Sequence, residues 1–466
     1  MATVASNFAQ AEPLPKAVLD DIGQNIFRCY QCVKCTSGCP LADQFDLTPN
    51  QVMRSLQLND PTVLESKAIW LCASCQTCAS RCPQDINVTG VMDSLRIEAG
   101  KRGISPAVPD VQRFHWLFMQ FIKYLGRVPE LMFILVYKLV RGKPFSDVGI
   151  GLRMLKKGKL KLLPHFARTP RKVVPLDEPE GKVAYFPGCS ASSSAREYDL
   201  TVRSTADVLN INLVEPPGWV CCGSSSAHAT DSSQAHVFPL RTMSTIERMG
   251  MTTVTSPCSN CFARLKMAEF EGMQDRQALE KVAAITDYQY QGKVRVQHFV
   301  DTIMEHATPE KISEKVKRPL EGLKVACYYG CLITRPAKAT AAENPEYPMK
   351  MDYLLQSLGA ETVDWSYKTD CCGGSLSVTQ SELALEMSEA ILKDAKACGA
   401  EAVITMCPMC HMNLDARQPD MKTNFDIPIF HSTQLTTLAF GLDVKDSHFN
   451  KNIVDPVPLL KSKQLV

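Results

Sequence analysis

The sequence predicts an α+β protein in three parts: an N-terminal helical part rich in cysteine, followed by two copies of an α/β unit. Three observations carry this prediction. Two runs of four cysteines stand close together before residue 90. A stretch rich in proline and charge follows at Pro164–Gly181. Beyond it, the same order of cysteines, helical patterns and β-branched strands occurs twice, about 150 residues apart.

The composition is that of a globular protein with several domains. The chain has 466 residues, 45% of them hydrophobic, and a net charge of +2. Such a balanced charge gives no global field that would favour nucleic acid as a partner. The N-terminus lacks the regions of a secretory signal, and the longest apolar run, Leu131–Tyr137, is too short to span a bilayer. We therefore expect a cytoplasmic protein, at most peripheral on the cytoplasmic membrane face through a partner.

The N-terminal part contains the pattern CxxCxxCxxxCP twice, and 8 of the 20 cysteines belong to it. In a reducing compartment, cysteines at such fixed spacings are metal ligands more often than disulfides. In two-cluster ferredoxins the first three cysteines of each run bind one [4Fe-4S] cubane and the fourth binds the other. We therefore expect one cubane on Cys29, Cys32, Cys35 and Cys82, and a second on Cys72, Cys75, Cys78 and Cys39.

Two zinc sites are the alternative for these cysteines, but structural zinc prefers two separated CxxC pairs. Two cubanes bound only by thiolates form an electron relay, because they leave no open coordination site. Nothing near them in the sequence suggests a catalytic acid, base or nucleophile. We therefore expect the reaction to take place elsewhere in the chain.

Helices are expected to fill the rest of the N-terminal part, which we assign to residues 1–165. Thr48, Pro49 and Gln51 have the spacing of a capping box, which predicts a helix between the two cysteine runs. Val111–Val140 is apolar and aromatic, and Arg153–Lys161 is basic. We expect a helix that packs on its own domain or on a partner protein, with contact to a membrane surface as the alternative.

A linker is expected at residues 166–181, followed by two repeated units at residues 182–318 and 319–466. KVAYFPGC ends at Cys189, and KVACYYGC ends at Cys331. The later cysteines are offset by 150, 150, 149 and 149 residues. The first unit contains Cys189, Cys221, Cys222, Cys258 and Cys261, and the second contains Cys331, Cys371, Cys372, Cys407 and Cys410.

Helical and strand patterns lie between these cysteines in both units. The helical patterns are at residues 196–209, 351–358 and 383–398, and the strands are at residues 252–255 and 402–405. We therefore expect two α/β units with their cysteines on loops at the ends of strands.

Each unit offers five cysteines, one more than a cubane uses. Either one thiol is a free redox group, or the cluster has another shape in which cysteine sulfurs bridge iron atoms. The adjacent cysteines favour bridging, because neighbouring side chains reach neighbouring irons. The glycine after each pair, Gly223 or Gly373, allows a positive φ that other residues resist.

These motifs resemble the heterodisulfide reductases. AYFPGCSASSSAREYDL, WVCCGSSSAHATD and SPCSNCFARLK resemble the first half of their B-type polypeptide, and YYGCLITRP, CCGGSLS and CPMCHMNLDARQ resemble its second half. The N-terminal part, through MLKKGKLKLLP, resembles the C-type polypeptide. The chain is therefore similar to a fusion of the C-type and B-type polypeptides, in the order found in the D-type polypeptide of the membrane-bound form.

The resemblance implies that all five cysteines of each CCG unit bind a noncubane [4Fe-4S] cluster, and that the ten are catalytic. The two clusters would flank a disulfide, such as that of coenzyme M and coenzyme B, and reduce it to two thiols in one-electron steps. The implied electron donor is a flavin-containing, electron-bifurcating A-type polypeptide or a membrane cytochrome b. The alternatives are an electron-relay component of a quinone-linked or acyl-CoA reductase-linked complex, and a scaffold stabilised by zinc.

Two cysteines and two histidines outside these sets need their own interpretation. Cys327 and Cys398 are expected to be core thiols. His411 follows Cys410 and either donates a hydrogen bond to cluster sulfur or packs beside it. His228 is a candidate proton donor to a leaving thiolate.

Weaker signals complete the sequence. His298 and His431 have no such context and are expected to be structural. An anionic disulfide needs cations near its ends, and the candidates are Arg196, Arg264, Arg335 and Lys338. Neither GxGxxG after a strand nor GxxxxGK[ST] occurs, so no nucleotide or flavin site is expected.

Overall fold

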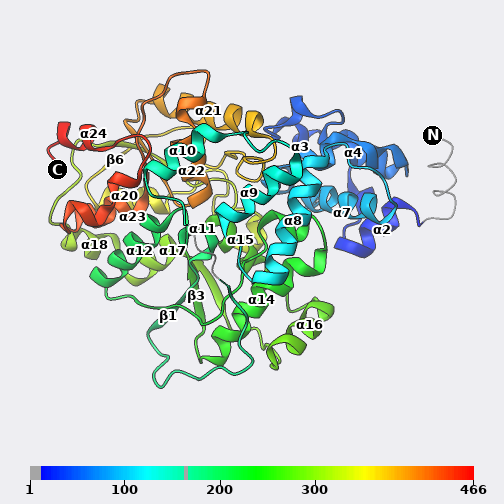
Figure 1. Ribbon diagram of the computed structural model, residues 1–466, viewed down its shortest axis with the longest axis horizontal. Coiled ribbons are helices and arrows are strands. Elements are labelled where there is room, and N and C mark those ends of the chain that lie inside the picture. The colour runs from blue at the N-terminus through cyan, green and yellow to red at the C-terminus, as the bar shows by residue number, and fades with distance from the viewer. Residues whose placement is uncertain (1–11, 162–165) are drawn as a thin grey trace.

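The computed structural model describes residues 12–161 and 166–466 and consists of a helical part and two α/β repeats (Figure 1). The predicted α+β class, with an N-terminal helical part and a duplicated α/β unit, is confirmed. Residues 1–11, which supplied part of the argument against a secretory signal, lie outside the described residues. Residues 162–165, where Pro164 begins the proline-rich stretch, also lie outside them.

Short helices form the first section of the N-terminal part and surround its two cysteine runs. They are α2 (Leu14–Ile22), α3 (Lys34–Ser37), α4 (Pro49–Gln57), α5 (Lys67–Leu71), α6 (Thr77–Ser80) and α7 (Val88–Lys101). The predicted capping box begins α4, where the backbone N–H of Thr48 donates to Oε1 of Gln51 at 2.8 Å. Val52, Leu56 and Val91 are buried in the core that joins these helices.

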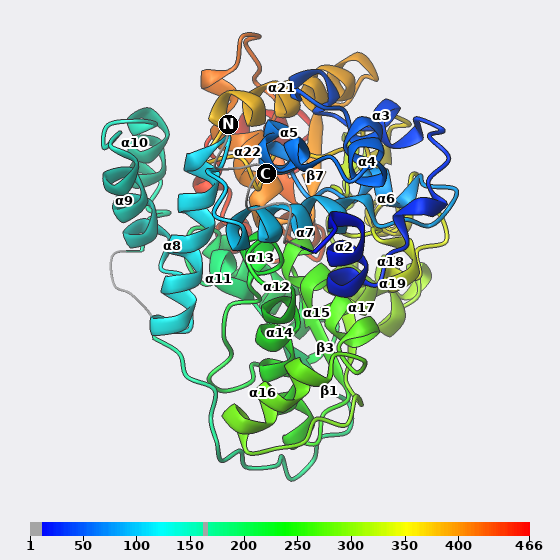
Figure 2. The same cartoon turned by 90° about the vertical axis from the view of Figure 1, so that its right-hand side faces the viewer.

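Three further helices lead from this section toward the repeats: α8 (Pro109–Leu125), α9 (Glu130–Arg141) and α10 (Val148–Lys156). The single helix predicted over residues 111–140 is wrong, because the chain breaks between α8 and α9. Gly126 ends α8 with a φ of 73°, and Pro129 then precedes α9. α9 and α10 lie together beyond α8 at the edge of the molecule (Figure 2).

Within residues 12–161 and 166–466, no helix combines the length and the apolar character that crossing a bilayer requires.

The first repeat contains a four-stranded parallel sheet in the order β2-β1-β3-β4. Its strands are β1 (Lys182–Tyr185), β2 (Asn212–Val214), β3 (Thr253–Ser256) and β4 (Arg295–His298). Its helices are α11 (Gly188–Ala191), α12 (Arg196–Val208), α13 (Ser224–His228), α14 (Ser232–Arg248), α15 (Ser259–Glu271), α16 (Arg276–Thr286), α17 (Phe299–His306) and α18 (Pro309–Lys315).

The second repeat has the equivalent strand order, β6-β5-β7-β8, also parallel. Its strands are β5 (Lys324–Tyr328), β6 (Glu361–Thr362), β7 (Ala402–Thr405) and β8 (Ile429–His431). Its helices are α19 (Ala337–Thr340), α20 (Lys350–Ser357), α21 (Ser381–Ala397), α22 (Pro408–Ala416), α23 (Ser432–Ala439) and α24 (Val457–Ser462).

The two sheets share one hydrophobic core. Val254 of β3 and Ile404 of β7 are fully buried in it, as expected for parallel strands covered on both faces. The carboxyl ends of parallel strands meet at one edge of a sheet, where ligand sites of α/β folds form. Cys258 follows β3 and Cys407 follows β7, so both repeats bring cysteines to this edge.

Candidate functional site

All ten cysteines of the two repeats line a single cavity of about 530 Å³. Cys258 is the residue before α15, and Cys407 is the residue before α22, so each CxxC motif begins a helix directly after a strand. The structure therefore brings the two repeated sets together, although the equivalent cysteines are about 150 residues apart in the chain.

The glycine after each cysteine pair has the backbone conformation that the sequence predicted. Gly223 has a φ of 89°, and a Cβ there would lie 2.6 Å from Cβ of Ala227. Gly373 has a φ of 74°, and a Cβ there would lie 2.8 Å from Cα of Ala384. Both turns therefore require glycine, for conformational freedom and for space.

Within each repeat, the thiols gather around a common point. Sγ of Cys222 lies 3.5 Å from Sγ of Cys261, and Sγ of Cys372 lies 3.6 Å from Sγ of Cys410. The thiol of Cys221 also contacts that of Cys189, and this contact is the first cause of its strongly raised pKa. Cys371 and Cys331 make the same contact in the second repeat.

The two sets meet at their CxxC motifs. The pKa of Cys407 is lowered well below its usual value, first by a hydrogen bond from the thiol of Cys258 and then by one from Cys410. Since Cys258 belongs to the first repeat, this contact joins the two sets at the centre of the site. A ligand in the cavity therefore lies against both.

Cysteines of the two N-terminal runs lie close to one another across the runs. Burial raises the pKa of Cys39 to about 12, and the nearby thiols of Cys72 and Cys75 contribute. Cys39 thus lies beside the second run as well as beside Cys35 of its own run. Cys82 lies beside the first run, since its charge and that of Cys32 both raise the pKa of Tyr30, after desolvation.

The second N-terminal run touches the second repeat directly. The thiol of Cys75 is hydrogen-bonded to that of Cys371, which is the first cause of the strongly raised pKa of Cys75. Oγ of Ser375 donates to the carbonyl oxygen of Ala73 at 2.9 Å. The path from the N-terminal thiols to the cavity is therefore one of direct side-chain contact.

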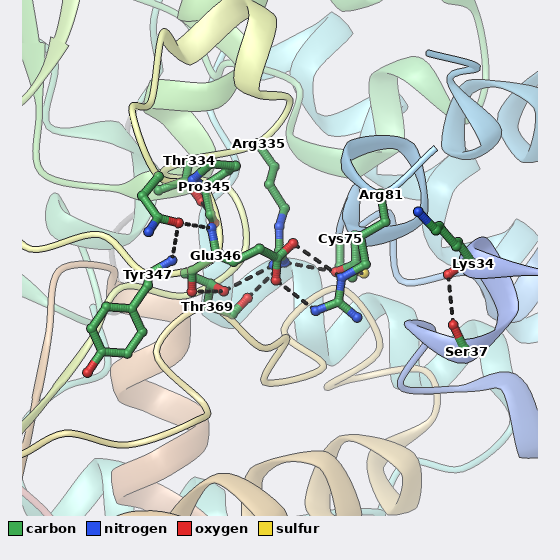
Figure 3. A network of polar contacts seen from close by, with 12 residues as sticks. Lys34, Ser37, Cys75, Arg81, Thr334, Arg335, Pro345, Glu346, Tyr347 and Thr369 are labelled. Atoms are coloured by element: carbon green, nitrogen blue, oxygen red, sulfur yellow. Dashed lines mark hydrogen bonds and ion pairs between the residues drawn. The ribbon is translucent and has the colours of Figure 1, made fainter. Parts of the chain in front are cut away.

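Beside the contact of Cys75 with Cys371, ion pairs join the N-terminal part to the second repeat (Figure 3). Glu346 accepts from Nη2 of Arg81 at 2.7 Å and from Nη2 of Arg335 at 3.1 Å. Nη1 of Arg335 also donates to Oγ1 of Thr77 at 2.8 Å. The expectation that Arg335 binds substrate is wrong, because its side chain is fully buried in this interface and does not line the cavity.

The remaining cation candidates differ in their positions. Lys338 is paired with Asp85 at 3.2 Å on the surface, and Arg196 does not line the cavity. Arg264 does line it, as does Arg417, which the sequence analysis missed. Both side chains are buried, and neither Nε has a hydrogen-bond partner among the described residues. They follow Cys261 by three residues and Cys410 by seven, so both face the cavity from the helix that carries their CxxC motif.

His228 also lines the cavity, and its partner comes from the N-terminal part. Nδ1 of His228 lies 2.7 Å from Oδ2 of Asp93, which is paired with Arg96 at 2.7 Å. Burial lowers the pKa of His228, and Asp93 opposes that shift. The sequence identified His228 by its position after the cysteine pair, whereas Asp93 carried no local signal.

The other histidines serve packing. Nε2 of His298 lies 2.9 Å from the carbonyl oxygen of Met406, so it bridges the repeats as a structural residue. Nε2 of His411 lies 3.0 Å from the carbonyl oxygen of Ile429, and its ring stacks on His431. His411 therefore packs beside the site, as one of its two interpretations predicted. Its Nε2 faces the carbonyl oxygen of Ile429 and does not bond to cluster sulfur.

The two cysteines outside the sets have different environments. Cys327 is fully buried on β5, as expected for a core thiol. Cys398 is exposed at the end of α21, so its interpretation as a core thiol is wrong. The helix ends there because Gly399 follows with a φ of 81°.

Comparison with known proteins agrees with this division. A family model described as "Cysteine-rich domain" (CCG) matches residues 183–266 and 325–415, and one described as "4Fe-4S dicluster domain" matches residues 28–87. The B polypeptide of a CoB-CoM heterodisulfide reductase of Methanosarcina acetivorans is 27% identical over 289 residues, 60% of this chain and 96% of that polypeptide. The iron-sulfur C 2 polypeptide of a CoB–CoM heterodisulfide reductase of Methanocaldococcus jannaschii is 38% identical over 84 residues, 18% of this chain and 45% of that polypeptide.

The chain belongs to the heterodisulfide reductase family. It is an iron–sulfur electron-transfer protein in which a C-type part precedes a B-type part with two CCG domains.

One further relative and one solved structure are also similar to this chain. The 8-methylmenaquinol:fumarate reductase membrane anchor subunit of Wolinella succinogenes is 33% identical over 283 residues, 59% of this chain and 98% of that protein. A crystal structure of a hypothetical protein from Helicobacter pylori shares the fold, with a TM-score of 0.56 and 10% identity over 97% of this chain and 79% of that one. The named relatives are components of larger complexes, and their names include two different activities.

Proposed function

We propose that the chain reduces a disulfide to two thiols, with a noncubane [4Fe-4S] cluster held by the five cysteines of each CCG domain. The eight N-terminal cysteines hold two cubane [4Fe-4S] clusters in the interleaved assignment. The observation that carries this proposal is the single cavity lined by all ten CCG cysteines, whose two sets meet at Cys258 and Cys407. Five gathered thiols on each side fit a cluster that uses all five.

The reaction consumes two electrons and two protons: the S–S bond breaks, and each sulfur leaves as a thiol. When bound, the clusters supply one-electron transfers. The chain's cysteines set the route, since Cys32 is exposed at the surface and Cys75 contacts Cys371 at the cavity. Electrons therefore enter at the N-terminal part and reach the second CCG domain before the first.

An electron donor must dock near Cys32. Phe27, Tyr30 and Val33 are exposed beside this cysteine, although large apolar side chains are usually covered. This apolar rim suits a partner protein, either a flavin-containing, electron-bifurcating protein of the A type or a membrane cytochrome b.

Polar residues of the cavity supply protons and bind charge. His228 holds a proton on the cavity wall, and Asp93 orients its ring through Nδ1. Arg264 and Arg417 offer unpaired Nε groups to the anionic ends of a disulfide substrate.

A second function is worth testing because the outer part of the cavity is apolar. Phe118, Phe133, Ile134 and Met154 line it, and such a wall suits a quinone better than a charged disulfide. In this case the chain is a relay component without a disulfide substrate. The menaquinol named in the Wolinella relative is consistent with this alternative.

The test is EPR spectroscopy of the anaerobically prepared holoprotein, oxidised and then titrated with thiols such as coenzyme M. A new paramagnetic signal that depends on thiol supports disulfide chemistry, and Cys371→Ala should remove it. Cys398→Ala is the matched control, because it removes an exposed thiol outside all four sets. Reduced-cubane signals that respond to a quinone analogue, and to no thiol, would assign the chain to the relay function.

A further inference from the structure

Helices α9 and α10 carry an exposed apolar face. On α9 it consists of Met132, Leu135 and Leu139, and on α10 of Val148, Leu152 and Leu155. Each trio has the spacing of one helical stripe. We call α9, α10 and the segment between them the α9–α10 hairpin. Phe145, between the two helices, is its most exposed large apolar residue, at 85%. Contiguous apolar surface of this kind marks an interaction site.

The same region concentrates positive charge. Residues 123–161 contain ten Lys and Arg and only two Asp and Glu, although the whole chain has a net charge of only +2. The two acids are paired: Glu130 accepts from Oγ of Ser190 at 2.6 Å, and Asp147 lies 3.6 Å from Lys138. Three of the cations are paired with acids from outside the segment: Arg141 with Asp110, Arg153 with Asp420 and Lys159 with Glu197. Lys143 and Lys156 are exposed beside the apolar stripes. The outward face is therefore apolar and cationic.

The hairpin is held to the CCG domains at its base. Lys159 forms a buried ion pair with Glu197 of α12. Nζ of Lys451 donates to the carbonyl oxygen of Lys157 at 2.9 Å, and Arg153 donates to that of Ala416 at 3.2 Å. These contacts hold the end of α10 against the CCG domains, and α9 and α10 lie at the edge of the molecule (Figure 2).

The cavity opens through this face. Leu135, Val148, Leu152 and Leu155 line the cavity and are also exposed. The matched family regions end at residue 87 and resume at residue 183, so the hairpin lies outside both. It is thus a feature of this chain that the family models do not describe.

We infer that the α9–α10 hairpin binds directly to an anionic phospholipid surface, with the cavity mouth against the lipid. The apolar stripes enter the boundary between headgroups and acyl chains, and the flanking lysines pair with lipid phosphates. The exposed lysines beside the stripes, Lys143 and Lys156, favour lipid over a protein partner, whose interface would need matching acidic residues. This inference does not rest on the proposed function, because it depends only on the exposed apolar stripes and lysines of the hairpin.

The test is flotation of the full-length holoprotein with vesicles of phosphatidylcholine alone or with phosphatidylglycerol added. Leu139→Gln with Phe145→Ser should weaken binding roughly tenfold or more, because both side chains leave the lipid. Neither residue lines the cavity. The matched control is Leu58→Gln with Phe270→Ser, since Leu58 is 63% exposed and Leu139 is 67% exposed.

Charge is tested separately. Lys143→Gln and Lys156→Gln should each weaken binding to the anionic vesicles about fivefold, and added salt should do the same. Lys350→Gln, at an exposed lysine of α20, should have no effect. The inference is overturned if the holoprotein floats with neither vesicle, or if the control variants lose as much binding. Loss of a copurifying protein in Leu139→Gln with Phe145→Ser, without vesicle binding by the parent, would assign the face to a protein partner.

Discussion

The two CCG domains present equal sets of five thiols to the cavity, but they meet the N-terminal part through different chemistry. The second domain meets it through sulfur, since Cys371 contacts Cys75. The first meets it through a histidine, since His228 is bonded to Asp93. The residue equivalent to His228 in the second domain, 150 positions later, is Val378. The N-terminal part occurs once and contacts each CCG domain differently, so the two domains are no longer equivalent.

This asymmetry separates two tasks within one site. Under the proposed function, the second domain receives electrons and the first supplies protons. The duplication provides matching cluster ligands, whereas the packing of the N-terminal part determines which domain does what. Each of the following experiments acts on one domain and compares it with the other.

The largest effect is expected from removing one cysteine of each domain. Cys371→Ala and Cys221→Ala should both abolish turnover, because each removes a ligand from its set. They should differ in reduction by an electron donor: Cys221→Ala leaves the contact with Cys75 intact, so the second domain is still reduced. In Cys371→Ala neither domain should be reduced. EPR during anaerobic donor titration measures this difference, and equal reduction in both variants would contradict the route.

The next effect concerns proton supply by the first domain. His228→Gln should lower the turnover rate by about 10²- to 10⁴-fold, the usual contribution of a general acid. Because burial lowers the pKa of His228 below 6.5, its protonated form is lost as the pH rises through the lowered value. The parent rate should therefore fall with rising pH, and the variant should lack this dependence.

The control for this experiment is another histidine–aspartate pair. His236→Gln removes a histidine whose Nδ1 lies 2.9 Å from Asp275 and which does not line the cavity. Its rate and pH profile should match those of the parent. A similar pH change in both variants would show that His228 has no special role.

A smaller effect should distinguish the glycines before the first cysteine of each set. A Cβ on Gly188 would lie 2.6 Å from Sγ of Cys261, whereas one on Gly330 would lie 3.1 Å from Sγ of Cys410. Both have a positive φ, so alanine costs about 1–2 kcal/mol at either position. Gly188→Ala should lose further stability, together with bound iron, because it displaces a thiol.

Iron analysis and thermal unfolding measure this comparison. Gly399→Ala is the control, because Gly399 has a φ of 81° and nothing within 4 Å of an added Cβ. It should show the conformational cost alone and keep its iron. Equal iron loss at Gly188 and Gly399 would contradict the role of the sulfur contact.

The smallest effect concerns how acid changes the stability of the two interfaces that the N-terminal part forms, one with each CCG domain. Burial lowers the pKa of His115, which packs against Ser226 of the first domain, to about 3. The unfolded chain therefore binds a proton between pH 6.5 and 3 that the folded chain does not, so stability falls as the pH falls through this range. At pH 5 the loss is about 2 kcal/mol.

The interface of the second domain should resist mild acid. Burial of Glu346 is outweighed by Arg81 and Arg335, so its pKa is lowered from 4.5 and its stabilising effect is lost only below that pH. Unfolding at pH 7 and pH 5 tests the difference. His115→Gln should remove about 2 kcal/mol of the loss, and an unchanged loss would contradict the assignment.

Local pattern predicted much of the fold. The capping box at Thr48 predicted the start of α4, and the β-branched segments predicted β3 and β7. The break between α8 and α9 was missed, because apolar residues continue across Gly126. Cys398 was misjudged for a related reason: its neighbours in sequence are apolar, but its position at the end of α21 exposes it.

Some residues of the candidate site were also predicted from the sequence, and others were found only in the structure. The cysteine sets were predicted from the spacing within each N-terminal run and from the repetition of the CCG motifs. Asp93 and Arg417 were not, because their relevance depends on contacts across domains. Arg335 had the right charge and the right distance from a cysteine in sequence, yet it lies in an interface.

The sequence by itself determined the number of cysteine sets, the duplication of the CCG set and the α/β pattern of the two units that carry it. These features depend on spacing over tens of residues. Only the tertiary structure decided that the two CCG sets share one cavity, and that Ser375 and Ala73, 302 residues apart, join the N-terminal part to the second domain. The reason is physical: ligand spacing and strand formation depend on local geometry, whereas domain contacts depend on buried surfaces that no short segment specifies.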